Sequence, residues 1–223
     1  MSDALTLEVF QDLYLRGPDE ARSALRAAIL GLVKPPWRHT PEKEEHLSKY
    51  ASGSNDILVF ERDASDGLVG TGLVLWSTPD GYQVTNIVPT ESGSLSYASY
   101  NRILQDFEHR VAGPASELAK FKLELTPPRQ SIDDWLPPSV ADALRRFSSL
   151  ANKQMGASHP LDRRRWLTFL IDAHRDNHSF NSERLARWLI EVERWPEDNA
   201  HDLAIEYEFA LALLRQYDQA PAS

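Results

Sequence analysis

Side chains that could do chemistry fall together between Ala151 and Trp166, in the stretch ANKQMGASHPLDRRRW. The histidine of this stretch, His159, precedes three consecutive arginines, Arg163, Arg164 and Arg165. Guanidinium groups pair with phosphates and carboxylates, and an imidazole can donate a proton near neutral pH. If a helix starts here, its free N–H groups add to the same attraction for negative charge. The pattern therefore predicts a surface for an anion or for an acidic partner.

The same stretch also has what an ordinary helix start requires. Ser158 or His159 can cap the helix, and Pro160 suits its first turn. Asp162 would lie in that turn, where a negative charge complements the helix dipole. The sequence leaves both interpretations open, a well-formed helix N-terminus and a binding surface of His159 with the three arginines.

Two histidines offer a second, weaker pattern. His174 and His178 are spaced i, i+4 and would share one face of a continuous helix, where they could hold a metal ion. Asn177-His178-Ser179 looks like a helix end, however, and no carboxylate completes a zinc signature. We expect no metal and no other cofactor.

The remaining candidates for catalysis are carboxylate pairs, Asp133-Asp134 and Glu191 with Glu193. A shared proton would need both carboxylates in one pocket, and neighbouring helical residues point in different directions, so we expect solvated faces. The sequence contains no Gly-x-Ser-x-Gly, P-loop, His-Glu-x-x-His or dinucleotide fingerprint. No catalytic residue is predicted.

Composition narrows the class of protein. The chain has 223 residues, of which 42% are hydrophobic and 26% charged, and these values are typical of a folded globular protein. It has no cysteine, which excludes disulfides and thiolate sites and favours a reducing cytoplasm. The N-terminus lacks the pattern of a secretory signal, and no apolar run approaches the roughly 20 residues that cross a bilayer. We expect a cytoplasmic protein without a membrane partner.

The net charge of −9 is spread along the chain. Residues 1–128 carry 18 Asp and Glu against 12 Lys and Arg, and residues 129–223 carry 15 against 12. Nonspecific nucleic-acid binding needs a basic face, so a nucleic-acid partner is not expected. Anion or nucleic-acid binding through Arg163–Arg165 stays an alternative.

Periodicity and turn residues predict sheet and helices in the first half. Strands are predicted over Leu5–Val9, Ile57–Arg62, Leu68–Trp76, Tyr82–Val88 and Lys120–Leu125. Helices are predicted over Ala21–Val33, from Thr40 to Tyr50, and through Tyr100 to Val111, where Gly113-Pro114 ends the helix. Phe10 to Leu15 is compatible with either type. Asp66-Gly67 and Pro79-Asp80-Gly81 join the three central strands into an antiparallel meander.

The second half is predicted to be helical. Pro137-Pro138-Ser139 is expected to precede a helix that runs to about Asn152. Further helices are expected over Leu161–His174, Glu183–Trp195 and Asn199–Tyr217. The fold class is therefore α+β, with an N-terminal antiparallel sheet and its helices in residues 1–127 and a helical, bundle-like part in residues 128–223. The proline-rich joint between them is short, so we expect the two parts to pack as one unit.

The order of elements in residues 1–152 resembles the GNAT acyltransferase fold. The third meander strand ends in Ile87-Val88-Pro89, and the loop that follows reads Pro89-Thr-Glu-Ser-Gly-Ser-Leu-Ser-Tyr97. It is similar in place to the loop with which that family holds the pyrophosphate of acyl-CoA. The resemblance implies that Ser92, Gly93 and Ser94 would bind acyl-CoA in a degenerate acyltransferase.

Aromatic residues suggest a different function. The chain has six tryptophans and seven tyrosines, and we expect Trp37 and Trp135 to lie in proline-flanked loops outside any periodic stripe. Tryptophan and tyrosine often anchor interfaces, although a loop can also fold back and bury them. With the negative charge and the absent catalytic signatures, they favour a bacterial protein-interaction factor with a protein partner. Such a factor would be partner-neutralising, like an antitoxin or immunity protein, or an accessory protein, and not an enzyme.

Overall fold

The computed structural model describes residues 5–49, 56–176 and 180–220. The chain divides into two compact units, Glu8–Pro128 and a second unit that combines Met1–Leu7 with Arg129–Ser223. The division falls one residue after the boundary expected at residue 127. The sequence pattern does not predict that the N-terminal residues belong to the C-terminal unit. The α+β class is confirmed, while the packing of the two parts as one unit stays a prediction.

The N-terminal unit is built on a six-stranded sheet with the strand order β3-β4-β5-β6-β2-β7. Every pair of neighbouring strands is antiparallel. The strands are β2 (Leu13–Arg16), β3 (Trp37–His39), β4 (Ile57–Arg62), β5 (Thr71–Thr78), β6 (Gly81–Pro89) and β7 (Lys122–Leu125). The predicted meander is confirmed as β4-β5-β6. The segment left open at Phe10–Leu15 contributes to strand β2, which lies between β6 and β7 because its leucines pack into the core.

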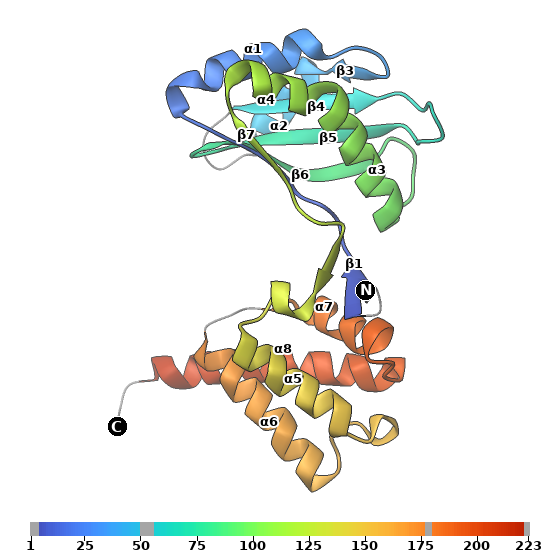
Figure 1. Cartoon of the computed structure of the whole chain (residues 1–223), viewed down its shortest axis with the longest axis vertical. Coiled ribbons are helices and arrows are strands. Elements are labelled where there is room, and N and C mark those ends of the chain that lie inside the picture. Colours follow the sequence, from blue (N-terminus) through green and yellow to red (C-terminus); the bar gives the residue numbers. More distant parts are fainter. Residues whose placement is uncertain (1–4, 50–55, 177–179, 221–223) are drawn as a thin grey trace. The chain divides into compact units, whose positions relative to one another are not determined.

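Three helices cover one face of this sheet, as Figure 1 shows: α1 (Arg22–Leu32), α3 (Tyr97–Phe107) and α4 (Gly113–Ala119). Leu25, Ile103 and Phe107 from these helices share one hydrophobic core with the inward side chains of the strands. A short helix, α2 (Pro41–Ser48), packs against β4. All six residues of β4 are buried.

Two expectations for this unit are wrong. Gly113-Pro114 does not end the helix, because a π-helical segment, Glu108–Ala112, leads directly into α4 and the Gly113 N–H donates to the Glu108 carbonyl. Pro114 lies in the first turn of α4, where its missing N–H costs least. Trp37 does not lie in a loop. It is part of β3 and pairs with Arg62 of β4.

The C-terminal unit is helical, as predicted, and adds a short ribbon in which β1 (Thr6–Glu8) pairs with β8 (Arg129–Ser131). Its main helices are α5 (Pro138–Leu150), α6 (Pro160–Arg175), α7 (Ser182–Arg187) with a π-helical continuation over Trp188–Val192, and α8 (Glu197–Gln219). Phe147, Trp166 and Phe169 form a chain of ring contacts, and Phe169 stacks on Tyr207 of α8 at 5.7 Å. None of the described helices is long and apolar enough to span a membrane.

A buried charge holds the N-terminal unit together. The Arg62 side chain is fully buried, and its Nε donates to Asp106 Oδ2 of α3 at 3.1 Å. Trp37 Nε1 donates to the same oxygen at 2.8 Å, and Arg110 donates to Oδ1 at 2.7 Å. The other Arg62 nitrogens donate to the Asp63 carbonyl and to Ser65. Asp106 therefore ties α3 to β3 and β4.

These contacts set the protonation of Asp106. Burial alone would raise the pKa of this carboxyl group, but hydrogen bonds from Arg110, Trp37 and Arg62 outweigh it and hold the pKa below its usual value. The ionised Asp106 carboxylate thus makes its full contribution to the free energy of unfolding above the pKa of an unfolded aspartate, about 3.9. It is lost as the pH falls through the lower folded pKa.

Replacing Asp106→Asn keeps the shape and removes the charge, which leaves the buried Arg62 with only the exposed Asp66, at 3.9 Å, as a counterion. We expect the free energy of unfolding of this unit to fall by about 3 kcal/mol at neutral pH, and by less at acid pH, where the wild-type carboxyl group is itself protonated. Urea denaturation followed by tryptophan fluorescence measures it. The control is Asp63→Asn, which removes an exposed ion pair with Arg38 and should cost less than about 1 kcal/mol. Equal losses in the two variants would contradict the account.

Candidate functional site

The structure gives His159 a clear local role at the start of α6. Its Nδ1 accepts the N–H of Leu161 at 3.3 Å, so His159 is the N-cap and Pro160 opens the helix. Ser158 turns the other way, and its hydroxyl donates to the Met155 carbonyl. These contacts support the interpretation of the stretch as an ordinary helix start.

The three arginines after His159 do not form one surface. Arg163 pairs with Glu206 of α8 at 2.6 Å. Arg165 turns back to Asp162, a buried carboxylate, at 2.7 Å, and the other oxygen of that carboxylate accepts the Asn152 N–H. Arg164 makes no ion pair within the described residues. The expected cluster of His159 with all three arginines is therefore not formed. His159 caps the helix, Arg163 and Arg165 are held in ion pairs, and Arg164 alone has no ion pair within the described residues.

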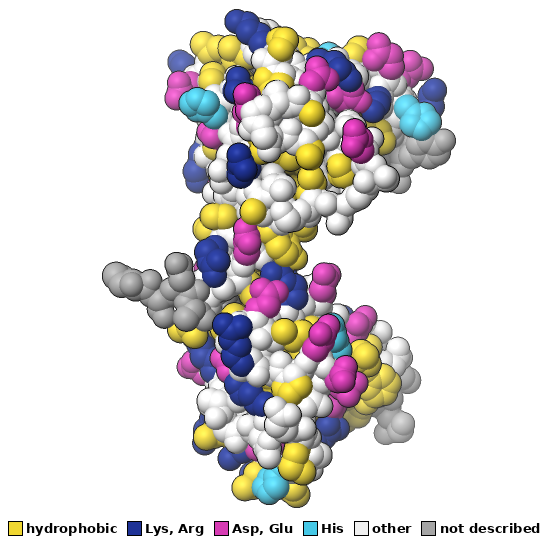
Figure 2. All heavy atoms as spheres, turned by 90° about the vertical axis from the view of Figure 1, so that its right-hand side faces the viewer, with side chains coloured by type: hydrophobic (Ala, Val, Ile, Leu, Met, Phe, Trp, Pro, Cys, Tyr) yellow, Lys and Arg dark blue, Asp and Glu magenta, His cyan; other side chains and the backbone are white. Residues whose placement is uncertain are grey.

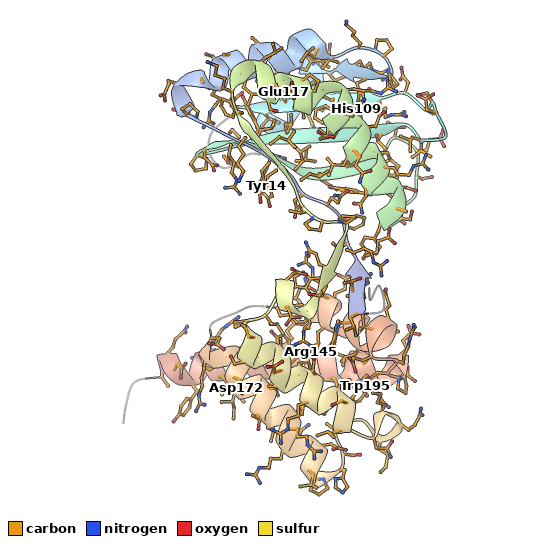
Figure 3. The ribbon with its side chains drawn as sticks, viewed as in Figure 1. Tyr14, His109, Glu117, Arg145, Asp172 and Trp195 are labelled. Atoms are coloured by element: carbon orange, nitrogen blue, oxygen red, sulfur yellow. The ribbon has the colours of Figure 1, made fainter. Side chains whose placement is uncertain are left out.

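Arg164 faces a groove between α5 and α6 with a volume of about 550 Å³. Arg146 of α5 also lines the groove and, like Arg164, has no carboxylate partner in the described part of the chain. Arg165, which is paired with Asp162, also lines the groove. Two hydroxyls and two carboxylates complete the polar lining: Ser139, Thr168, Asp142 and Asp172, the last on α6 (Figure 3). Two guanidinium groups beside two hydroxyls can hold an anion, although the carboxylates weaken the attraction.

The two tryptophans expected at an interface are mostly covered by their own unit. Trp37 is 1% exposed and leaves no area for a partner. Trp135 is half-buried, donates its indole N–H to Gln130 and stacks on Phe180 at a centroid distance of 5.5 Å. Arg184 lies over its ring. The structure thus favours the alternative in which the chain folds over these rings.

The loop of the acyltransferase resemblance is exposed. Ser92, Gly93 and Ser94 lie between β6 and α3, and Gly93 has a φ of 142° that a side chain would strain. Ser96 caps α3 by accepting the Ser99 N–H at 3.2 Å. Binding of acyl-CoA at this loop stays a prediction.

The weaker candidates have partners of their own. His174 pairs with Asp218 of α8 at 2.7 Å, and His178 lies outside the described residues. Among the residues that the structure describes, no group of three His, Asp or Glu side chains could hold a metal ion. The members of each carboxylate pair have different partners. Asp133 pairs with Arg145, and Asp134 accepts the Ser131 N–H. Glu191 pairs with Arg187, and Glu193 accepts from Ser148 and Lys153.

The feature that the sequence reasoning missed is the outer face of α8. Ile205, Phe209, Leu213 and Tyr217 are between 56% and 76% exposed, and they are spaced four residues apart. This spacing places them in one row along the helix. The opposite face carries Leu203, Tyr207 and Leu211, which are buried. The signal in the sequence is a helix that is apolar on two sides, since only one of the two sides can face the core.

Helix α6 extends this row. Leu167 and Ile171 are 43% and 41% exposed, and Ile171 lines a hollow of about 710 Å³ together with Tyr217. Two side-chain contacts bridge the helices, the ion pair of Arg163 with Glu206 and the hydrogen bond of His174 with Asp218. We call the six exposed side chains the α6–α8 face: Leu167, Ile171, Ile205, Phe209, Leu213 and Tyr217.

Charged groups border the α6–α8 face without covering it. Glu208 is exposed and accepts only a 3.3 Å hydrogen bond from Ser182, and Arg215 makes no ion pair within the described part of the chain. In Figure 2, hydrophobic side chains gather at the lower right, on the helical unit, beside acidic side chains. Elsewhere in that view, basic and acidic groups are mixed, and no face of a single sign is seen.

The inner side of α8 is fixed by packing and by one polar contact. Tyr207 is buried, which raises the pKa of its phenol, and its oxygen accepts the Phe180 N–H at 3.2 Å. The orientation of α8 is therefore set by its buried residues, and the outer row must face away from the core.

Comparison of the chain with family models, with curated proteins and with solved structures gave no match.

Arg164 and Arg165 are neighbours with different roles, so their replacements should differ. Arg165→Ala leaves the buried Asp162 without its charged partner, and we expect it to lower the free energy of unfolding by about 2 kcal/mol. Arg164→Ala is the matched control and should change it by less than about 0.5 kcal/mol. Urea unfolding followed by tryptophan fluorescence measures both. If Arg164→Ala is the more destabilising, the assignment of roles is wrong.

Proposed function

We propose that this chain is a protein-binding factor and that the α6–α8 face is the surface through which it binds. One observation carries the proposal: four large hydrophobic side chains of α8 lie more than half exposed in one row. Single exposed hydrophobic residues are normal on protein surfaces, but an aligned row marks an interaction site or an aggregation hazard.

Covering this row would favour binding through the hydrophobic effect. Each square ångström of apolar surface removed from water contributes roughly 25 cal/mol. Phe209 and Tyr217 can anchor a partner at low entropic cost because each has only two side-chain torsions. The row lies on a helix whose inner face is packed, so little ordering is needed on binding.

The class of factor follows from the rest of the molecule. A protein that acts by occupying another surface, such as an antitoxin, an immunity protein or an accessory subunit, needs an exposed docking face and no catalytic centre. The exposed Glu208 beside the row suits a partner that places a basic group opposite it. We therefore place the chain among bacterial, cytoplasmic interaction factors.

A photoreactive phenylalanine analogue at position 209 tests the proposal in the native host. We expect a covalent protein adduct on irradiation, because position 209 lies at the centre of the row. The matched control is the same analogue at Leu118 of α4, an isolated hydrophobic residue that is 70% exposed. An adduct at 209 that is absent at 118, and absent when Leu213→Glu is added, supports the proposal. No adduct at 209, or equal adducts at both positions, contradicts it.

A second candidate function is the binding of a phosphate-bearing ligand in the groove between α5 and α6. The observation that favours it is the presence of two guanidinium groups, Arg146 and Arg164, without carboxylate partners in the described structure.

Inorganic pyrophosphate is a suitable probe for this groove. If the groove is an anion site, saturating pyrophosphate should raise the melting temperature of the wild type but not of Arg164→Ala. The control is Arg163→Ala, which removes an arginine paired with Glu206 and should leave the shift unchanged. A shift that survives in Arg164→Ala, or none in the wild type, removes this candidate.

A further inference from the structure

We propose that the α6–α8 face binds a second copy of this chain, with the two α8 helices antiparallel about a two-fold axis at the level of residues 210–212. The inference rests on the proposed function, since it names the partner of the same face. Three features of α8 support this dimer: the order of the side chains in the exposed row, the charges that border the row, and a small residue close to the two-fold axis.

The exposed row of α8 is complementary to the same row of a second copy when the two helices are antiparallel. In an antiparallel pair, Phe209 lies opposite Leu213 of the second copy, and Ile205 lies opposite Tyr217 of that copy. Each aromatic ring thus meets an aliphatic side chain, twice in the dimer. Ala212 is exposed, lies near the axis and allows the helices to approach closely.

The charges that border the row follow the same symmetry. Glu208 and Arg215 are two turns apart on one flank, so the antiparallel pair places Glu208 opposite Arg215 of the second copy, and the reverse. Arg215, which has no ion pair within the described residues, then gains one. On the other flank Glu206 lies opposite Tyr217 of the second copy, whose hydroxyl can donate to it.

The alternative arrangements fit less well. A parallel pair about a two-fold axis would place the flank that carries Glu208 against the opposite flank of the second copy, which carries Glu206, and like charges repel. A different partner protein would have to supply both an apolar row and a basic group opposite Glu208, which this chain already supplies by itself. The complementarity therefore favours a second copy.

Sedimentation of the purified full chain between about 1 and about 100 µM, the range in which a modest interface dissociates, measures the association. We expect a monomer–dimer equilibrium for the wild type and a monomer for Phe209→Glu, with unchanged circular dichroism and urea midpoint. The control, Leu118→Glu, places the same charge at another exposed position and should still dimerise. A monomeric wild type at every concentration overturns the inference.

A charge exchange tests the antiparallel direction. Glu208→Arg alone and Arg215→Glu alone should each weaken dimerisation about tenfold, because each creates two like-charge contacts; this corresponds to about 1.4 kcal/mol. The double variant, Glu208→Arg with Arg215→Glu, should restore the wild-type dissociation constant. If Glu208 and Arg215 do not pair, the losses of affinity of the two single variants should add in the double variant. A double variant that fails to restore the wild-type dissociation constant therefore overturns the proposed pairing.

The photoreactive analogue at position 209 separates this inference from the proposed function. An adduct with twice the mass of the chain supports the second copy. An adduct only with a protein of another mass overturns the second copy and leaves the proposed function intact. No adduct, in the purified protein or in the host, overturns both.

Discussion

The packing of α8 is the constraint on which the functional account depends. Its inner face places Leu203, Tyr207 and Leu211 in the core of the C-terminal unit, and Phe169 stacks on Tyr207. Once these residues are buried, the period of the helix fixes the direction of the side chains on its opposite face. Ile205, Phe209, Leu213 and Tyr217 must then point outward together. The exposed row is therefore a consequence of how the unit folds and needs no special local conformation.

The N-terminal unit depends on a different kind of interaction. There a buried cation, Arg62, is balanced by Asp106 and by backbone carbonyls, and the same carboxylate receives Trp37 and Arg110. Such a network fixes the position of α3 against the sheet more specifically than apolar contact alone. It also explains why Trp37 is buried: its indole N–H has a charged acceptor inside the unit.

Local patterns were sufficient for much of the fold. The meander followed from Asp66-Gly67 and Pro79-Asp80-Gly81, and the four C-terminal helical segments followed from apolar periodicity. The errors arose where distant residues decide the outcome. Strand β3 forms because Trp37 pairs with β4, and the helix continues through Gly113 because a π-helical turn shifts its hydrogen bonds.

The candidate site was harder to predict for the same reason. His159 and the three arginines lie close together in the sequence, yet two of the arginines pair with Glu206 and Asp162 and point in different directions. The outer row of α8 was visible as four apolar residues at a spacing of four. Its exposure could not be known until the tertiary packing had fixed the opposite face.

The central claim is that another polypeptide covers the outer face of α8 in the cell. Because the chain has no cysteine, one introduced thiol reports on one position without background. The direct measurement compares the rate at which a small polar maleimide labels Ala212→Cys in intact cells with the rate for Ala24→Cys, an exposed control on α1. The account predicts slow labelling at 212 that speeds up when Phe209→Glu is added. Equal rates at the two positions would contradict it.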